Sequence, residues 1–155
     1  MLKIGITGGI GSGKSTVCNI LRNLGVPIFY SDEEGRKLLN EDRTLISMVI
    51  KKFGKDMYNV EGKLDRKRMA NLVFNNPKAL ERLTSFVHPK VNDRFSEWVM
   101  LHERSPYVVK EAAILFESGT YHDLDKIINV SAPKNVRIKR VMKRDGSTRE
   151  EVEKR

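Results

Sequence analysis

A glycine-rich segment near the start of the chain constrains the fold more than any other feature. Residues Gly8 to Ser15 read Gly-Gly-Ile-Gly-Ser-Gly-Lys-Ser and match the pattern G-x-x-x-x-G-K-[ST] in full. In such a loop the backbone N–H groups curl around two phosphates, and side chains at the turns would collide with the ligand. Lys14 would add an ammonium at the β- and γ-phosphates, and the Ser15 hydroxyl would coordinate Mg²⁺. The motif therefore predicts binding of a nucleoside triphosphate with magnesium.

The residues on both sides of this loop fit the prediction. Leu2 to Thr7 form a short apolar run typical of a buried parallel strand, and Pro27 to Tyr30 read as a second strand. Between them, Lys14 to Leu24 carry apolar residues at helical spacing, namely Val17, Ile20, Leu21 and Leu24. The order strand, loop, helix, strand predicts a βαβ unit and an α/β fold with a parallel sheet.

The rest of the chain divides into an insertion, two strands and a basic C-terminal part. Strands are predicted at Tyr107–Val109 and Lys126–Val130. The long stretch before them reads as helices over Arg43–Phe53, Asp65–Phe74 and Pro77–Glu103, interrupted at Gly54, at Glu61-Gly62 and at His88-Pro89. This stretch is far longer than a crossover needs, so a helical subdomain beside the sheet is expected.

The C-terminal part is predicted to form two short helices. Val136 to Arg144 carry a strongly basic pattern, and Asp145-Gly146-Ser147 should end this helix. Thr148 to Glu151 have the spacing of a capping box, which predicts the start of another helix. The resulting division is a single domain with its core at 1–31 and 105–135, a helical insertion at about 32–104 and a basic segment at about 136–155.

Composition and charge limit the kinds of molecule that this chain is expected to bind. The chain has 155 residues, 39% of them hydrophobic, and a formal net charge of +9, which favours anionic partners. Its basic residues are scattered without the interleaved aromatics of a single-strand binder, so nucleic acid is not expected as the main substrate. No leader or membrane-length apolar run is visible, and the single Cys18 favours a reducing compartment. A cytoplasmic protein without membrane attachment, working on small molecules as a monomer or weak homo-oligomer, is expected.

Two carboxylates are candidates for chemistry at the loop. Asp32 follows the second strand, at the sheet edge where the phosphate loop is also expected, and could activate an acceptor hydroxyl. It could also cap a helix over Glu33–Leu39, and the two roles are compatible. Glu111 ends the third strand on the same side and could hold a magnesium-bound water or pair with Lys14.

Segments outside the phosphate loop indicate which class of nucleotide-binding protein this is. The N-K-x-D segment with which GTPases read their base does not occur, and Tyr107 to Glu111 match the apolar-run-plus-Asp pattern of motor-type ATPases imperfectly. Small-molecule kinases remain. They need a carboxylate for the acceptor hydroxyl and cations that close over the transferred phosphoryl group.

Five segments together resemble a known family. They are Thr7 to Ser15, Ser31-Asp32, His88-Pro89, Ile114-Leu115-Phe116-Glu117, and Arg140 with Lys143-Arg144-Asp145. In this order and at these separations they are similar to the dephospho-coenzyme A kinase family of P-loop kinases, from Leu2 to Arg155. The resemblance implies ATP and Mg²⁺ as co-substrates and the ribose 3′-hydroxyl of dephospho-coenzyme A as the acceptor.

The resemblance also implies residue roles. Lys14, Asp32 and Arg140 would be catalytic, with Arg140 and Arg144 on a basic lid. The ATP site would comprise Gly9, Gly11, Ser12, Gly13, Lys14, Ser15, Thr16 and Arg144. Acceptor binding would fall to Thr7, Asp32, His88 and Glu117, and magnesium to Ser15 and Glu111. For His88 a purely structural role stays open, and Glu117 could be a surface residue.

The chain departs from the family pattern in two places. Ala112-Ala113 stand where family members usually have Pro before the L-L-F-E segment. Family members also continue beyond Arg155 through the rest of the lid and a further parallel strand, so the C-terminal part of the usual fold is expected to be missing. Lys126–Val130 would then be an unprotected sheet edge, and a product ending at Arg155 is expected to be poorly stable or weakly active.

Overall fold

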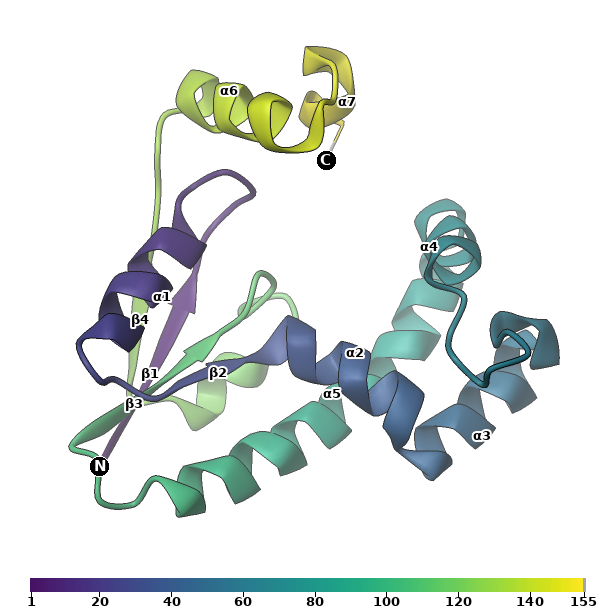
Figure 1. Ribbon diagram of the computed structural model, residues 1–155, viewed down its shortest axis with the longest axis horizontal. Coiled ribbons are helices and arrows are strands. Elements are labelled where there is room, and N and C mark those ends of the chain that lie inside the picture. Colours follow the sequence, from purple (N-terminus) through teal and green to yellow (C-terminus); the bar gives the residue numbers. More distant parts are fainter. Residues whose placement is uncertain (155) are drawn as a thin grey trace. The chain divides into compact units, whose positions relative to one another are not determined.

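The computed structural model describes residues 1–154 and shows an α/β protein (Figure 1). Contacts within the chain define two compact units, which we describe separately. The first comprises Met1–Tyr30 and the residues from Trp98 onward, and the second comprises Ser31–Glu97. No helix of the described residues is both long enough and apolar enough to span a bilayer.

The first unit is built on a four-stranded parallel sheet. Its strands are β1 (Leu2–Thr7), β2 (Ile28–Tyr30), β3 (Tyr107–Glu111) and β4 (Lys126–Asn129), in the order β2-β3-β1-β4. The predicted parallel sheet flanked by helices is confirmed. Because β3 lies between β1 and β2, the two strands that succeed one another along the chain are not neighbours. The register instead places Ile6 of β1 beside Glu111 of β3, so their carboxyl ends meet at one edge.

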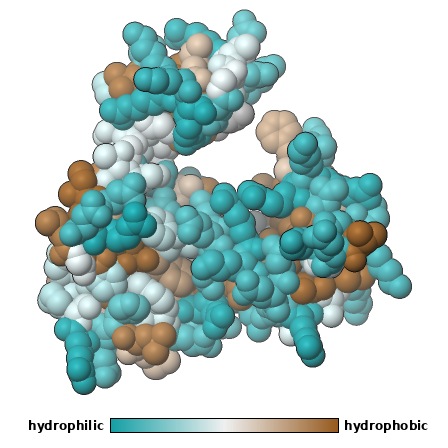
Figure 2. Space-filling model, viewed as in Figure 1, coloured by the Kyte–Doolittle hydropathy of each residue, from teal (hydrophilic) through white to brown (hydrophobic). Residues whose placement is uncertain are grey.

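Helix α1 (Lys14–Asn23) packs on one face of this sheet. The core there consists of buried Ile6, Cys18, Val26 and Val109, with Val17 and Leu21 packed against it. The predicted apolar face of α1 is partly wrong, since the Ile20 and Leu24 side chains are 55% and 74% exposed. Cys18 lies about 100° around the helix from Val17 and turns the buried face away from these two. Figure 2 shows the resulting hydrophobic surface over α1.

The predicted exposed edge of the sheet is present at β4. This strand pairs with β1, and its other side carries no strand of the described residues. Lys126 and Asn129 are exposed, and the Ile128 side chain is 45% exposed. The near-continuous burial expected for a parallel strand covered on both faces is therefore absent here.

The second unit is helical. It contains α2 (Ser31–Glu41), α3 (Arg43–Phe53), the 3₁₀ turn η1 (Lys55–Met57), α4 (Arg66–Asn75) and most of α5 (Pro77–Leu101). The side chains of Asp42 and Asp65 cap α3 and α4 by accepting from the backbone N–H groups of Leu45 and Arg68. The hydrogen bond from Leu45 holds the pKa of Asp42 below its usual value. Buried side chains from these helices form the core of the unit, among them Leu45, Val49, Met57, Met69 and Phe86.

The expected break at His88-Pro89 is wrong. Helix α5 runs through Pro89 without interruption for 25 residues. A proline inside a helix costs about 3 kcal/mol because it removes one backbone hydrogen bond and crowds the preceding turn. The buried side chains of Phe86 and Val91 on either side of Pro89 supply the packing that offsets this cost.

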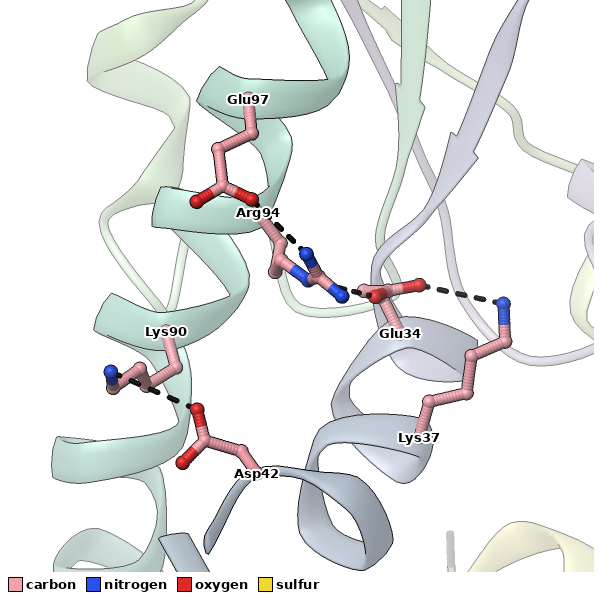
Figure 3. Close-up of polar contacts among 6 residues, drawn as sticks. All are labelled: Glu34, Lys37, Asp42, Lys90, Arg94 and Glu97. Atoms are coloured by element: carbon pink, nitrogen blue, oxygen red, sulfur yellow. Dashed lines mark hydrogen bonds and ion pairs between the residues drawn. The ribbon is translucent and has the colours of Figure 1, made fainter. Parts of the chain in front are cut away.

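Ion pairs join α2 and the start of α3 to α5 (Figure 3). The Glu34 carboxylate accepts contacts from Arg94 at 3.6 Å and Lys37 at 3.5 Å, and Arg94 also binds Glu97 at 3.1 Å. Asp42 pairs with Lys90 at 3.7 Å. Such exposed pairs contribute little to stability, but together they fix how α2 lies along α5 within this unit.

A lysine lies inside the first unit. Lys110 is the last residue but one of β3 and is 1% exposed, and burial lowers its pKa from the ordinary 10.5 to about 8, against the opposing charge of Asp123. At pH 7 the folded state therefore holds a buried charge that the unfolded chain would keep in water. Stability should rise as the pH increases from about 8 toward 10.5, because the folded state loses this proton first.

We expect Lys110→Met to raise the free energy of unfolding at pH 7 by up to about 3 kcal/mol. At pH 10 most of this gain should disappear, because wild-type Lys110 is then neutral in the folded state. Urea denaturation of both proteins at the two pH values measures the difference. Lys126→Met, at an exposed lysine of β4, is the control and should show no such pH dependence. An equal effect of Lys110→Met at both pH values would contradict the buried charge.

Candidate functional site

The loop between β1 and α1 has the backbone geometry of a phosphate cradle. Gly11 and Gly13 have φ values of +73° and +109°, which favour glycine, and Ser12 N–H donates to the Gly9 carbonyl at 3.1 Å. A Cβ at Gly8 would collide with the carbonyl oxygen of Val130, in the segment after β4. The sheet itself therefore requires a glycine where the loop begins.

The amino end of α1 is open toward this loop. The helix starts at Lys14, and its N-cap Gly13 offers no side-chain hydrogen bond, so the first N–H groups remain available to an anion. The Lys14 ammonium donates to the Gly8 carbonyl at 2.6 Å and so lies across the loop. Ser15 and Thr16 are exposed at the start of the helix.

A cavity of about 430 Å³ opens at this place. It is lined by Gly9 to Thr16, by Ala113 after β3, and by Arg140, Val141 and Arg144 of α6 (Lys134–Asp145). Backbone amides, one ammonium and two guanidinium groups thus surround one hollow. This combination suits a polyphosphate.

The two guanidinium groups are held differently. Arg140 Nη1 donates to the carbonyl oxygens of Gly11 and Ser12 at 3.3 and 3.2 Å. Arg144 binds Asp145 with two parallel hydrogen bonds of 2.7 and 3.1 Å, and this contact raises the pKa of Arg144. Arg140 is therefore held by the loop itself, whereas Arg144 is held by its neighbour in the sequence.

The comparisons with known proteins agree with this geometry. The family model described as dephospho-CoA kinase matches residues 2–155. The chain belongs to the dephospho-CoA kinase family. It is similar to the dephospho-CoA kinase of Chlorobaculum tepidum, with 44% identity over 99% of this chain and 76% of the relative. The corresponding protein of Chlorobium luteolum is 41% identical over 98% of this chain and 72% of the relative.

Solved structures share this fold, and one of them is a dephospho-CoA kinase. The crystal structure of TT1252 from Thermus thermophilus superimposes with a TM-score of 0.85 at 38% identity, covering 99% of this chain and 78% of that one. Dephospho-CoA kinase from Campylobacter jejuni gives 0.69 at 31% identity, with 98% and 77% covered. The predicted family and fold are confirmed.

Two further residues expected in the dephospho-CoA kinase site lie at the sheet edge of the first unit. Thr7 is buried, and its hydroxyl donates to the Ala113 carbonyl at 3.3 Å. Glu111 is half-buried, and its charge, together with that of Lys14, acts on the thiol of Cys18. Burial, reinforced by Glu111 and opposed by Lys14, raises the pKa of Cys18 to about 11. Glu111 and Lys14 are thus near enough to share one electrostatic environment.

The residues expected to bind the acceptor fall in both units. Glu117 is exposed in the turns after β3, in the first unit. His88 is half-buried in the middle of α5, in the second unit. Their roles stay predictions.

Asp32 lies at the start of the second unit, two residues after β2 ends. The helix α2 begins at Ser31, so Asp32 is an exposed residue of its first turn, and the alternative of an N-cap for a helix starting at Glu33 is wrong. Glu34 is two residues further, about 200° around the helix. Asp32 therefore lies on the side of α2 away from the ion pairs of Glu34, and its carboxylate takes no part in them.

The sequence did not single out Arg137, Val141 and Ala113 as site residues. The Arg137 guanidinium lies against Gly9, and Val141 and Ala113 line the cavity. One helix face carries Arg137, Arg140, Val141 and Arg144, and this spacing could have identified Arg137 and Val141 from the sequence. The contact of Ala113 depends on the path of the chain after β3 and has no such pattern.

We expect Lys14→Ala to weaken ATP binding by about 10- to 100-fold, because one charged donor at the phosphates is lost. Calorimetric titration with ATP measures this loss. The melting temperature should change little, since the replaced hydrogen bond is to one loop carbonyl. Lys3→Ala, a lysine at the opposite end of β1, is the control. Unchanged affinity in Lys14→Ala would contradict the site.

Proposed function

We propose that the chain transfers the γ-phosphoryl group of ATP to the ribose 3′-hydroxyl of dephospho-coenzyme A, with Lys14 and Arg140 at the phosphates and Asp32 at the hydroxyl. Membership of its family makes the chain an ATP-dependent kinase of dephospho-coenzyme A, acting in coenzyme A biosynthesis. The observation that carries the assignment of residues is the cavity shared by the phosphate loop and α6. There the chain's own groups can hold and neutralise a triphosphate.

Charge stabilisation is the main task of this site. The transferred phosphoryl group passes through a loose transition state with negative charge on its oxygens. The amides at the start of α1, the Lys14 ammonium and the Arg140 guanidinium all converge on the cavity and need little rearrangement to meet that charge. Arg144 could join them while Asp145 orients it.

Magnesium is proposed as the metal, and the side chains present suit it. Among the described residues no cluster of three His, Cys, Asp or Glu could hold a metal ion by itself. Mg²⁺ is usually bound by one or two protein oxygens together with substrate phosphates and water, so such a cluster is not needed. The Ser15 hydroxyl at the start of α1 and the Glu111 carboxylate at the end of β3 would hold it. The ion would neutralise charge on the β- and γ-phosphates.

Asp32 is proposed as the base that accepts the proton of the acceptor hydroxyl. It follows the carboxyl end of β2, whose last residue, Tyr30, is aligned with Glu111 in the sheet. The chain therefore leads from the sheet edge of the phosphate site to Asp32 within two residues. An exposed carboxylate with no ion pair among the described residues is suited to accept a proton.

Thr7, His88 and Glu117 are proposed to contact the acceptor. Thr7 would do so from the start of the phosphate loop, where its hydroxyl donates to the Ala113 carbonyl and ties the loop to the chain after β3. We further propose a cytoplasmic enzyme that works as a monomer or weak homo-oligomer.

The acceptor is tested by ADP release in a coupled assay with ATP and Mg²⁺. Dephospho-coenzyme A should stimulate release, whereas nucleosides, nucleoside monophosphates and shikimate should not. Stimulation by one of these others instead would reassign the acceptor within the small-molecule kinases.

We expect Asp32→Asn to lower kcat by about 10²- to 10⁴-fold, because the amide cannot accept the hydroxyl proton. The affinity for ATP should stay unchanged, since Asp32 is not part of the phosphate cavity. Steady-state rates with dephospho-coenzyme A and calorimetry with ATP measure the two quantities. Glu33→Gln, at the neighbouring exposed carboxylate, is the matched control and should keep full turnover. Equal turnover in wild type and Asp32→Asn would remove Asp32 from the mechanism.

We expect chelation of divalent ions to abolish turnover and Ser15→Ala to raise the Mg²⁺ concentration needed for half-maximal rate about tenfold. The physical reason is the loss of one of the few protein oxygens offered to the ion. Rates measured over a Mg²⁺ titration at saturating ATP give this concentration. An unchanged titration curve would exclude Ser15 as a ligand.

A further inference from the structure

The tip of the phosphate loop, Gly9 to Gly11, is packed against helix α6 as well as facing the cavity. Figure 1 shows α6 beside the loop that joins β1 to α1. A Cβ at Gly11 would lie 2.6 Å from the Arg137 carbonyl oxygen and 3.0 Å from Val141 Cγ2, so the helix backbone touches the loop here. The loop tip and the lid helix therefore leave no room between them for a side chain at this position.

Ile10 supplies the apolar part of this contact. Its half-buried side chain packs against a cluster of buried residues from α6 and α7 (Arg149–Glu153), namely Ile138, Val141 and Val152. These three are 1–5% exposed. The cluster is separate from the core between α1 and the sheet, so Ile10 is the residue through which the phosphate loop joins it.

Arg137 supplies the second part. A Cβ at Gly9 would collide with Arg137 Nη1, so the guanidinium lies directly on the loop backbone. The Arg137 Nε is buried and has no hydrogen-bond partner among residues 1–154. Arg137 is not among the residues that line the cavity. Its contact with Gly9 is therefore one of packing against the loop from outside the phosphate site.

We propose that Ile10 and Arg137 are positioning residues for phosphoryl transfer, which hold the lid helix on the loop tip so that Arg140 stays at the phosphates. We call these two residues the lid seat. The inference rests on the proposed function, because it assigns to Arg140 the phosphates of ATP. It also gives a reason for glycine at positions 9 and 11, which the nucleotide-binding pattern leaves variable.

The lid seat has a consequence for water. With α6 held on the loop, the cavity has Arg140 and Val141 as one wall, and water competes poorly with the acceptor hydroxyl. When a substitution weakens the lid seat, α6 should be separated from the loop for part of the time. Transfer to the acceptor should then slow, while hydrolysis of ATP by water should gain relative to it.

The first experiment changes Ile10. We expect Ile10→Ser to lower the acceptor-dependent kcat about tenfold and to raise the ratio of ATP hydrolysed to acceptor phosphorylated about tenfold. Ile10→Val keeps an apolar branched side chain and should restore both values to within about twofold of wild type. Leu24→Ser, at an exposed apolar residue of α1, is the control and should leave both unchanged. Equal loss of both reactions in Ile10→Ser would mean damage to the whole fold and would overturn the proposal.

The second experiment is a double-mutant cycle on Gly9 and Arg137. No left-handed φ is required at Gly9, so Gly9→Ala introduces one methyl group whose close contact is the Arg137 guanidinium. If Gly9 acts through Arg137, then Gly9→Ala should change the hydrolysis ratio in wild type and change it no further in Arg137→Ala. Additive effects would show that the methyl group acts on the nucleotide instead, and would overturn the role of Arg137.

Calorimetry with ATP alone separates this proposal from the identity of the acceptor. Without any acceptor, Ile10→Ser should bind ATP about tenfold more weakly than wild type, because a charged donor is no longer held at the phosphates. Leu24→Ser should bind as wild type does. If dephospho-coenzyme A gave no turnover, the proposed function would fail while this difference remained. Equal ATP affinity of all three proteins would overturn the lid seat.

Discussion

The rest of the structure depends on one constraint, the close contact between the backbone of the phosphate loop and the residues around it. The phosphate loop is pressed by Val130 at Gly8, by Arg137 at Gly9 and by the backbone of α6 at Gly11. At Gly8 and Gly11 the neighbour is backbone, so only a residue without a side chain can pass there and still turn its amide inward. The loop position follows from the sheet, because Thr7 ends the strand that lies between β3 and β4.

The sheet order brings the chemistry together. With β3 next to β1, Glu111 stands beside Ile6 and close to the loop, and the chain after β3 can bond Thr7 through Ala113. Had β2 been the neighbour of β1, as the order along the chain suggests, a different residue would stand there. The same arrangement buries Lys110 in β3, on the residue before Glu111. A central strand of the sheet thus carries a buried lysine whose pKa is lowered by burial.

Much of this was readable from the sequence. The loop, the four strands, the helix over Arg43–Phe53 and the capping box at Thr148 follow from local patterns, since glycine spacing, apolar runs and caps act over a few residues. Failures occurred where packing overrides local preference. Pro89 should end a helix, yet tertiary contacts on both sides carry α5 through it. Ile20 and Leu24 fit an apolar face, but the position of Cys18 decides which face meets the sheet. Arg137 was missed although it shares a helix face with Arg140 and Arg144, because a basic helix face does not tell which backbone segment it meets, here Gly9.

A small apolar cluster holds helices α6 and α7 together. Ile138, Val141 and Val152 form a cluster distinct from the core of the sheet, and Ile10 is its link to the phosphate loop. Elements with few buried contacts open at lower free energy than the core around them. The proposed lid, α6 with α7, should therefore open at lower free energy than the core around β1 and α1. Because Arg140 donates to the backbone carbonyls of Gly11 and Ser12, the proposed opening would withdraw this cation from the loop. In the proposed mechanism, lid position and electrostatic stabilisation of the phosphates would therefore change together.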